Sequence, residues 1–250
     1  MNGLPSTFII RSLLLIACFF FVPCRDVLAE NHWRAGLAKL DITPQQSVRL
    51  SGYGSRTQPT SVVATPLHTR CLAIQDHSKA THLLIAIETI GLPSEMTREI
   101  TQRIEQEHKI PRERIVVCST HTHCAPALGK QLNNIFKEPL NEEEQTAASQ
   151  YCDYLVSQTL AAANRAIDSL QPANVSFVRG QVNFASNRRV LADGKWTGFG
   201  VQEDGPVDHQ LPLIKITDRE QQLIGLVFNY ACHCTTLGGT YNEVNGDWAG

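Results

Sequence analysis

Residues 115–128 read IVVCSTHTHCAPAL and join a short apolar run to two closely spaced histidines. The β-branched run at 115–117 predicts a buried strand, and Pro126 ends the regular structure soon after it. In extended backbone, His121 and His123 point to the same side of the strand. Two neutral imidazoles placed in this way can share one metal ion, and zinc suits such ligands. The alternative is a polar loop that carries two surface histidines.

The sequence before this stretch predicts a β-α-β unit. Residues 71–74 and 83–87 are apolar runs separated by a turn, so they predict a hairpin. Pro93 begins a helix in which apolar residues recur on one face. These residues are Met96, Ile100 and Ile104. The strand at 115–118 follows this helix, and the order strand, helix, strand favours a parallel pair with a right-handed crossover.

A second, longer helix is expected after residue 141. Asn141 and Glu144 have the spacing of a capping box, and the helix should reach about Ile167. Its buried face consists of Ala148, Tyr151, Cys152, Leu155, Thr159, Ala162 and Ala166. Further strands are expected at 34–42, 175–179, 182–185, 213–216 and 223–230. This order indicates an α/β fold, a mixed β-sheet sandwich flanked by helices and incomplete at the C-terminus.

The first 29 residues have the features of a secretory signal peptide. Arg11 precedes an apolar run at 13–23, and small residues stand before an expected cleavage site after Ala29. The run is shorter than the roughly 20 residues that span a membrane. We therefore expect a secreted or periplasmic protein, with a lipidated Cys24 as the alternative.

Charge and cysteine content limit the classes of partner. The formal net charge of −2 gives no electrostatic reason to expect binding to nucleic acid. Six cysteines follow the signal peptide: Cys71, Cys118, Cys124, Cys152, Cys232 and Cys234. In an exported chain they could form disulfides, for example Cys118–Cys124, or remain as buried thiols.

Residues 223–250 supply a third histidine. The apolar strand expected there ends just before His233, as the strand at 115–118 ends before His121. If the two strands are parallel neighbours in one sheet, their carboxyl ends share an edge, and both histidines can bind one ion. Asp247 offers a carboxylate close by. A closed Cys/His structural zinc site is the alternative, although the CxxC spacing typical of such sites is absent.

Several short motifs occur in a fixed order along the chain. They are GLAKLDITP at 36–44, LSGYG at 50–54, THTH at 120–123 with Pro126, Asn187-Arg188-Arg189, NYACH at 229–233 and NGDWAG at 245–250. In this order they resemble the N-terminal catalytic domain of the neutral/alkaline, non-lysosomal ceramidases and their bacterial relatives. The resemblance covers nearly all of residues 30–250, which we expect to form a partial domain of this kind.

The resemblance implies a secreted zinc-dependent amidase that hydrolyses the N-acyl bond of ceramide or a related lipid amide. His121 and His233 would be zinc ligands, and His123 would be a catalytic residue beside the metal. Arg188 would contact the substrate or stabilise an oxyanion, for which a guanidinium is well suited. Asn187 would help to bind the substrate. A lipid substrate also allows peripheral contact with a membrane, whereas the sequence indicates no oligomeric state.

The sequence departs from the family pattern in two ways. Cys124 and Ala125 stand where the family usually has Ser-Gly before the proline. The family also takes a Glu and a Tyr ligand from further along the chain, beyond Gly250. We therefore expect a truncated chain that is a poor enzyme by itself. The alternatives are another secreted metallohydrolase and a non-catalytic remnant of the same fold.

Overall fold

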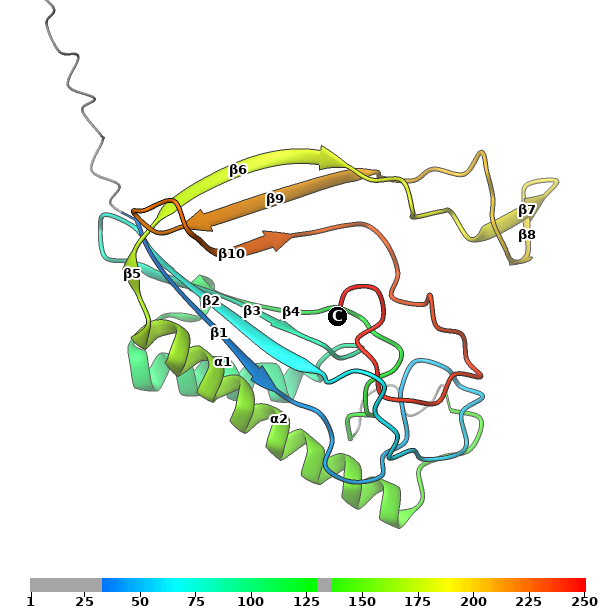
Figure 1. Ribbon diagram of the computed structural model, residues 1–250. Coiled ribbons are helices and arrows are strands. Elements are labelled where there is room, and N and C mark those ends of the chain that lie inside the picture. Colours follow the sequence, from blue (N-terminus) through cyan, green and yellow to red (C-terminus); the bar gives the residue numbers. More distant parts are fainter. Residues whose placement is uncertain (1–32, 130–135) are drawn as a thin grey trace, which may run out of the picture. The chain divides into compact units, whose positions relative to one another are not determined.

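The computed structural model describes residues 33–129 and 136–250, and Figure 1 shows its elements. The expected signal peptide lies outside the described residues. The elements are β1 (Arg34–Asp41), β2 (His68–Gln75), β3 (Thr81–Ile87), α1 (Ser94–His108), the 3₁₀ turn η1 (Arg112–Arg114), β4 (Ile115–Ser119), α2 (Glu142–Asp168), β5 (Gln171–Pro172), β6 (Asn174–Gln181), β7 (Arg189–Ala192), β8 (Lys195–Phe199), β9 (Gln210–Thr217) and β10 (Leu223–Phe228). In the described part, none of the helices combines the length and apolarity needed to cross a membrane.

A five-stranded sheet forms the centre of the fold, in the order β4-β3-β2-β1-β5. The hairpin of β2 and β3 is antiparallel, as predicted. α1 then leads to β4, which pairs with β3 in parallel. The β-α-β unit expected from the sequence is therefore confirmed, and α1 buries Met96, Ile100 and Ile104 as predicted.

The long helix α2 begins with the predicted capping box. The side chain of Asn141 accepts a hydrogen bond from the backbone of Glu144, and the Glu144 carboxylate accepts one from the Asn141 backbone. α1 and α2 lie on the same face of the five-stranded sheet (Figure 1). The contact between α2 and β1 requires a glycine, because a Cβ on Gly36 would lie 2.1 Å from the Ala166 carbonyl oxygen.

A second sheet, in the order β10-β9-β6, packs on the other face of the five-stranded sheet. Its Ile216 is fully buried against Ala35 and Leu72. β10 comes close to β1 at Gly225, where an added Cβ would lie 2.4 Å from a methyl carbon of Leu37. The two sheets and the helices form the mixed sandwich flanked by helices that the sequence predicts.

The segment between β6 and β9 differs from the prediction. The expected strand at 182–185 is absent, because its backbone is bonded to other groups: Val182 donates to the His209 carbonyl, and Ala185 donates to the hydroxyl of Tyr230. The hairpin of β7 and β8 was also not predicted. Asp193 and Gly194 both have positive φ in its turn, and Asp-Gly is a strong signal for such a turn.

Candidate functional site

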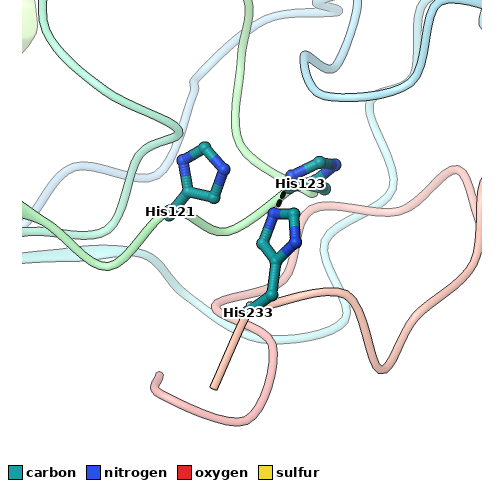
Figure 2. A group of neighbouring side chains, drawn as sticks. All are labelled: His121, His123 and His233. Atoms are coloured by element: carbon teal, nitrogen blue, oxygen red, sulfur yellow. Dashed lines mark hydrogen bonds between the residues drawn. The ribbon is translucent and has the colours of Figure 1, made fainter. Parts of the chain in front are cut away.

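Three histidines from two distant segments lie side by side, as Figure 2 shows. His121 and His123 follow β4, and His233 follows β10. One ring nitrogen from each histidine lies within 4.8 Å of the others. The rings of His121 and His233 are stacked with centroids 4.7 Å apart, and the ring of His123 meets His233 edge-on. The structure thus brings together all three histidines that the sequence singles out.

The strand arrangement that was predicted to bring His121 and His233 together is wrong. β4 and β10 belong to different sheets, so His121 and His233 do not share the edge of one parallel sheet. β10 also ends at Phe228, earlier than predicted, and the last residues before His233 have no regular structure. Hydrogen bonds between Cys232 and Tyr230 and between Thr235 and His233 turn this segment tightly. The path of the loop places His233 against the other two.

His121 has a left-handed backbone, with a φ of 65°, so the expected extended alternation does not apply to it. Its amide donates to the carbonyl of Thr89, which fixes the loop beyond β4. Its Nδ1 lies 2.6 Å from the carbonyl oxygen of Ile90. Because a carbonyl only accepts, Nδ1 carries the proton and Nε2 has a free lone pair. This arrangement is typical of a histidine that binds a metal through Nε2.

His123 and His233 contact each other through their Nε2 atoms, 2.9 Å apart. The Nδ1 of His233 lies 2.6 Å from a guanidinium nitrogen of Arg188. A guanidinium only donates, so Nδ1 of His233 accepts, its proton lies on Nε2, and Nε2 of His123 accepts the hydrogen bond from it. The lone pair on Nε2 of His123 is therefore engaged with His233. His233 can bind a metal through Nε2 only when its proton moves to Nδ1 and the bond to Arg188 is released.

The surroundings of His123 and His233 keep these two imidazoles neutral. Burial, followed by the proximity of His233 and His121, lowers the pKa of His123 to about 4. Burial and His121 also lower the pKa of His233. At neutral pH these rings are therefore uncharged, which is the state that binds metals. Three converging imidazoles, of which those of His123 and His233 are neutral, are a donor set that fits zinc and similar divalent ions.

The carboxylate of Asp247 does not belong to the histidine group. Its Oδ1 accepts from the Thr236 hydroxyl at 2.6 Å and from the Trp248 amide at 2.7 Å. Its Oδ2 accepts from the Leu237 amide at 3.1 Å. Asp247 therefore fastens the segment after His233 to the NGDWAG motif, although its charge is near enough to act on the pKa of His233.

Two neighbouring residues predicted to bind substrate have different surroundings. Arg188 is half-buried and reaches His233, as described above. Asn187 uses its side chain locally: Nδ2 donates to the Pro206 carbonyl at 3.1 Å, and Oδ1 accepts from the Arg189 amide at 3.0 Å. Asn187 thus shapes the segment that presents Arg188.

The LSGYG motif supports His123, a role that the sequence analysis does not assign. Gly52 has a φ of +94°, and a Cβ there would lie 2.4 Å from Cγ of His123. A side chain at position 52 would therefore be strained and would also displace the imidazole. The ring of Tyr53 packs on His123 with centroids 4.8 Å apart. A glycine within an otherwise ordinary loop is the signal that could have indicated this contact.

The six cysteines that follow the expected signal peptide are all free thiols. The suggested Cys118–Cys124 bridge is not formed. Cys118 donates to the Ile85 carbonyl, whereas the Cys124 sulfur lies 3.6 Å from a guanidinium nitrogen of Arg56. Burial raises the pKa of the Cys124 thiol, so the thiol is neutral at neutral pH. No cysteine belongs to the metal-ligand group found among the described residues, which disfavours the Cys/His structural site.

Comparison with known proteins identifies similar sequences and folds. Residues 33–250 match the family model of the neutral/alkaline non-lysosomal ceramidase, N-terminal. Neutral ceramidase A of Dictyostelium discoideum is 21% identical over 261 residues, which cover 96% of this chain and 35% of the relative. The neutral ceramidase of Drosophila pseudoobscura pseudoobscura is 20% identical over 231 residues, which cover 89% of this chain and 32% of the relative.

Solved structures show the same fold. The crystal structure of neutral ceramidase from Pseudomonas aeruginosa superposes with a TM-score of 0.67 at 20% identity, covering 86% of this chain and 34% of that one. A structure described as ceramidase complexed with C2 has the same TM-score and identity. The chain thus spans about a third of the length of the relatives that it matches. Since the family model matches nearly the whole described chain, this protein belongs to the neutral/alkaline non-lysosomal ceramidase family and corresponds to its N-terminal part.

Proposed function

We propose that His121, His123 and His233 form the histidine part of a zinc site in an amidase. The substrate would be ceramide or a related lipid amide, and the enzyme would hydrolyse its N-acyl bond. The observation that carries the proposal is the convergence of three imidazole nitrogens on one point. Membership of the ceramidase family and the names of the relatives support the choice of substrate.

Each residue would have a distinct role. His121 and His233 would hold the zinc ion, which supplies Lewis acidity, lowering the pKa of a water and polarising the amide carbonyl. His123 is buried beside them. Once Nε2 of His233 binds the metal and no longer donates to His123, Nε2 of His123 would accept the proton of the attacking water and return it to the leaving amine.

Arg188 would change partners when the metal is bound. A metal on Nε2 of His233 requires the proton on Nδ1, and a protonated Nδ1 no longer accepts from Arg188. The released guanidinium keeps its charge and its donors, and it would stabilise the negative charge that develops on the carbonyl oxygen. Asn187 would contribute by holding the segment that carries Arg188.

The test is the zinc-dependent release of fatty acid. Residues 30–250, loaded with zinc and incubated with a labelled N-acyl sphingoid amide in mixed micelles, should release labelled fatty acid, slowly in this short chain. Mass spectrometry measures the product, and His233→Ala is the matched control. Release that is equally fast in the control or in excess chelator would contradict the proposal. Stoichiometric zinc binding without any release would favour the non-catalytic remnant.

We also propose that residues 1–29 direct export and are removed, as the apolar run at 13–23 indicates. The exported protein is then expected to begin at Glu30. Amino-terminal sequencing of the secreted or periplasmic form measures this directly. An intact Met1, or a lipid on Cys24, would show the proposal to be wrong.

A further inference from the structure

Arg56 is a buried cation without an acidic partner. Arg56 is only 4% exposed. It forms no ion pair with a carboxylate in the part of the chain that the structure describes. Removing a guanidinium from water is costly unless its hydrogen bonds are replaced. The two terminal nitrogens of Arg56 donate to neutral acceptors around the histidine group, whereas its buried Nε has no partner among the described residues.

The guanidinium of Arg56 joins three segments of the chain. One nitrogen, Nη1, donates to the carbonyls of Ser51 and His123. The other, Nη2, donates to the Tyr241 carbonyl at 2.7 Å and lies 3.6 Å from the sulfur of Cys124. His123 and Cys124 belong to the loop after β4, whereas Tyr241 belongs to the segment that follows His233. One side chain thus connects the two segments that supply the histidines.

Tyr53 extends this connection to the imidazole. The guanidinium carbon of Arg56 lies 4.9 Å from the centroid of the Tyr53 ring, a cation–π distance. The same ring packs on His123, and its hydroxyl donates to the Leu237 carbonyl at 2.8 Å. Leu237 is four residues beyond His233. Arg56 therefore contacts His123 directly at its backbone carbonyl and indirectly through the Tyr53 ring, which is tilted against the imidazole.

We propose that Arg56 is a positioning residue that fixes His123 against His233. Three directional donors on one rigid plane hold the two loops in one relative position, which flexible loops would not keep by themselves. Lysine cannot substitute, because a single ammonium on a flexible stem does not reach carbonyls on several sides at once. The positioning of the histidines rests on contacts within this chain and goes beyond the proposed amidase activity.

The first test uses the metal-free protein and therefore does not depend on the proposed function. Long-range ¹H–¹⁵N spectra report the tautomer and surroundings of each histidine ring. Arg56→Met is expected to shift or broaden the His123 and His233 signals and to leave unchanged the signals of the exposed His82, at the end of β3 opposite the loop after β4. Arg49→Met is the matched control, because Arg49 is equally buried but bonds to α2 and to Glu138. The Arg49→Met substitution should lower the free energy of unfolding without shifting the His123 signals.

The second test measures the binding of the metal alone. Arg56→Met and Arg56→Lys are both expected to weaken Co²⁺ and Zn²⁺ binding by roughly 10–100-fold, because Arg56 ties the loop that carries His121 to the segment that carries His233 and so supports both proposed ligands. The visible absorption of bound Co²⁺ should also change, since it reports ligand geometry. If Arg56→Met does not fold, the same measurements are made on Arg56→Lys. Unchanged His123 signals and unchanged cobalt spectra in a folded variant would overturn the proposal. Spectral shifts in Arg56→Met together with no amidase activity in the unchanged protein would instead contradict the proposed function alone.

Discussion

The His233→Ala protein is expected to lose stoichiometric zinc and all zinc-dependent hydrolysis. Under the proposed function His233 is a direct ligand, and it is the histidine that comes from the second segment of the chain. Loss of a ligand should weaken zinc binding by more than the roughly 10–100-fold that supporting residues contribute. His121→Ala should have the same effect, because the bond from its Nδ1 to the Ile90 carbonyl leaves Nε2 free for the metal.

Substitutions at two neighbouring residues, His123 and Arg188, should affect turnover without the loss of zinc expected for a ligand. His123→Ala should retain much of the zinc and lose turnover, since His123 is proposed to transfer protons. Arg188→Met should bind zinc at least as tightly as the unchanged protein, because it no longer holds Nδ1 of His233 as an acceptor. Turnover should nevertheless fall, because the donor for the oxyanion is gone.

The measurements are zinc content by mass spectrometry, zinc affinity by competition with a chelator, and fatty acid release. His82→Ala is a control for histidine loss on the exposed part of β3. If His233→Ala keeps full zinc affinity and the full rate, His121 and His233 do not share an ion. If Arg188→Met loses zinc, then Arg188 stabilises the metal-bound form, and the release of its hydrogen bond is not part of loading.

The Arg49→Met protein is expected to lose about 3–5 kcal/mol of unfolding free energy, the usual cost of leaving one member of a buried ion pair alone. Arg49 and Glu144 form a two-bond ion pair, at 2.9 and 2.6 Å, with side chains only 5% and 6% exposed. Arg49 also donates to the Glu138 carbonyl. Without Arg49, the Glu144 carboxylate remains buried at the start of α2, and no other described residue forms an ion pair with it.

A double-mutant cycle separates the charge from the helix cap. Glu144→Gln removes the charge but can keep the capping bond to Asn141, because glutamine also serves in capping boxes. The combined Arg49→Met/Glu144→Gln protein should be more stable than Arg49→Met alone, since it buries no unpaired charge. Urea unfolding followed by circular dichroism gives the free energies. A loss in Arg49→Met of less than about 1 kcal/mol, typical of an exposed pair, would show that this pair is not effectively buried.

Local patterns in the sequence were sufficient for the elements that depend on neighbouring residues. The capping box of Asn141 and Glu144 fixes the start of α2, and the spacing of Met96, Ile100 and Ile104 fixes the buried face of α1. These features act within one or two helical turns, so the sequence displays them directly. The Asp-Gly turn of β7 and β8 was equally local and was visible in the sequence.

The sequence by itself singled out His121, His123 and His233, through the THTH and NYACH motifs and the family resemblance. Only the tertiary structure decided how they meet. They do not share a sheet edge; loops after two separate sheets converge, and the side chains of Arg56, Tyr53 and Asp247 hold those loops through contacts between residues far apart in the sequence. Such contacts have no periodicity or fixed spacing, because loop paths are set by directional hydrogen bonds to groups that only the folded chain brings near.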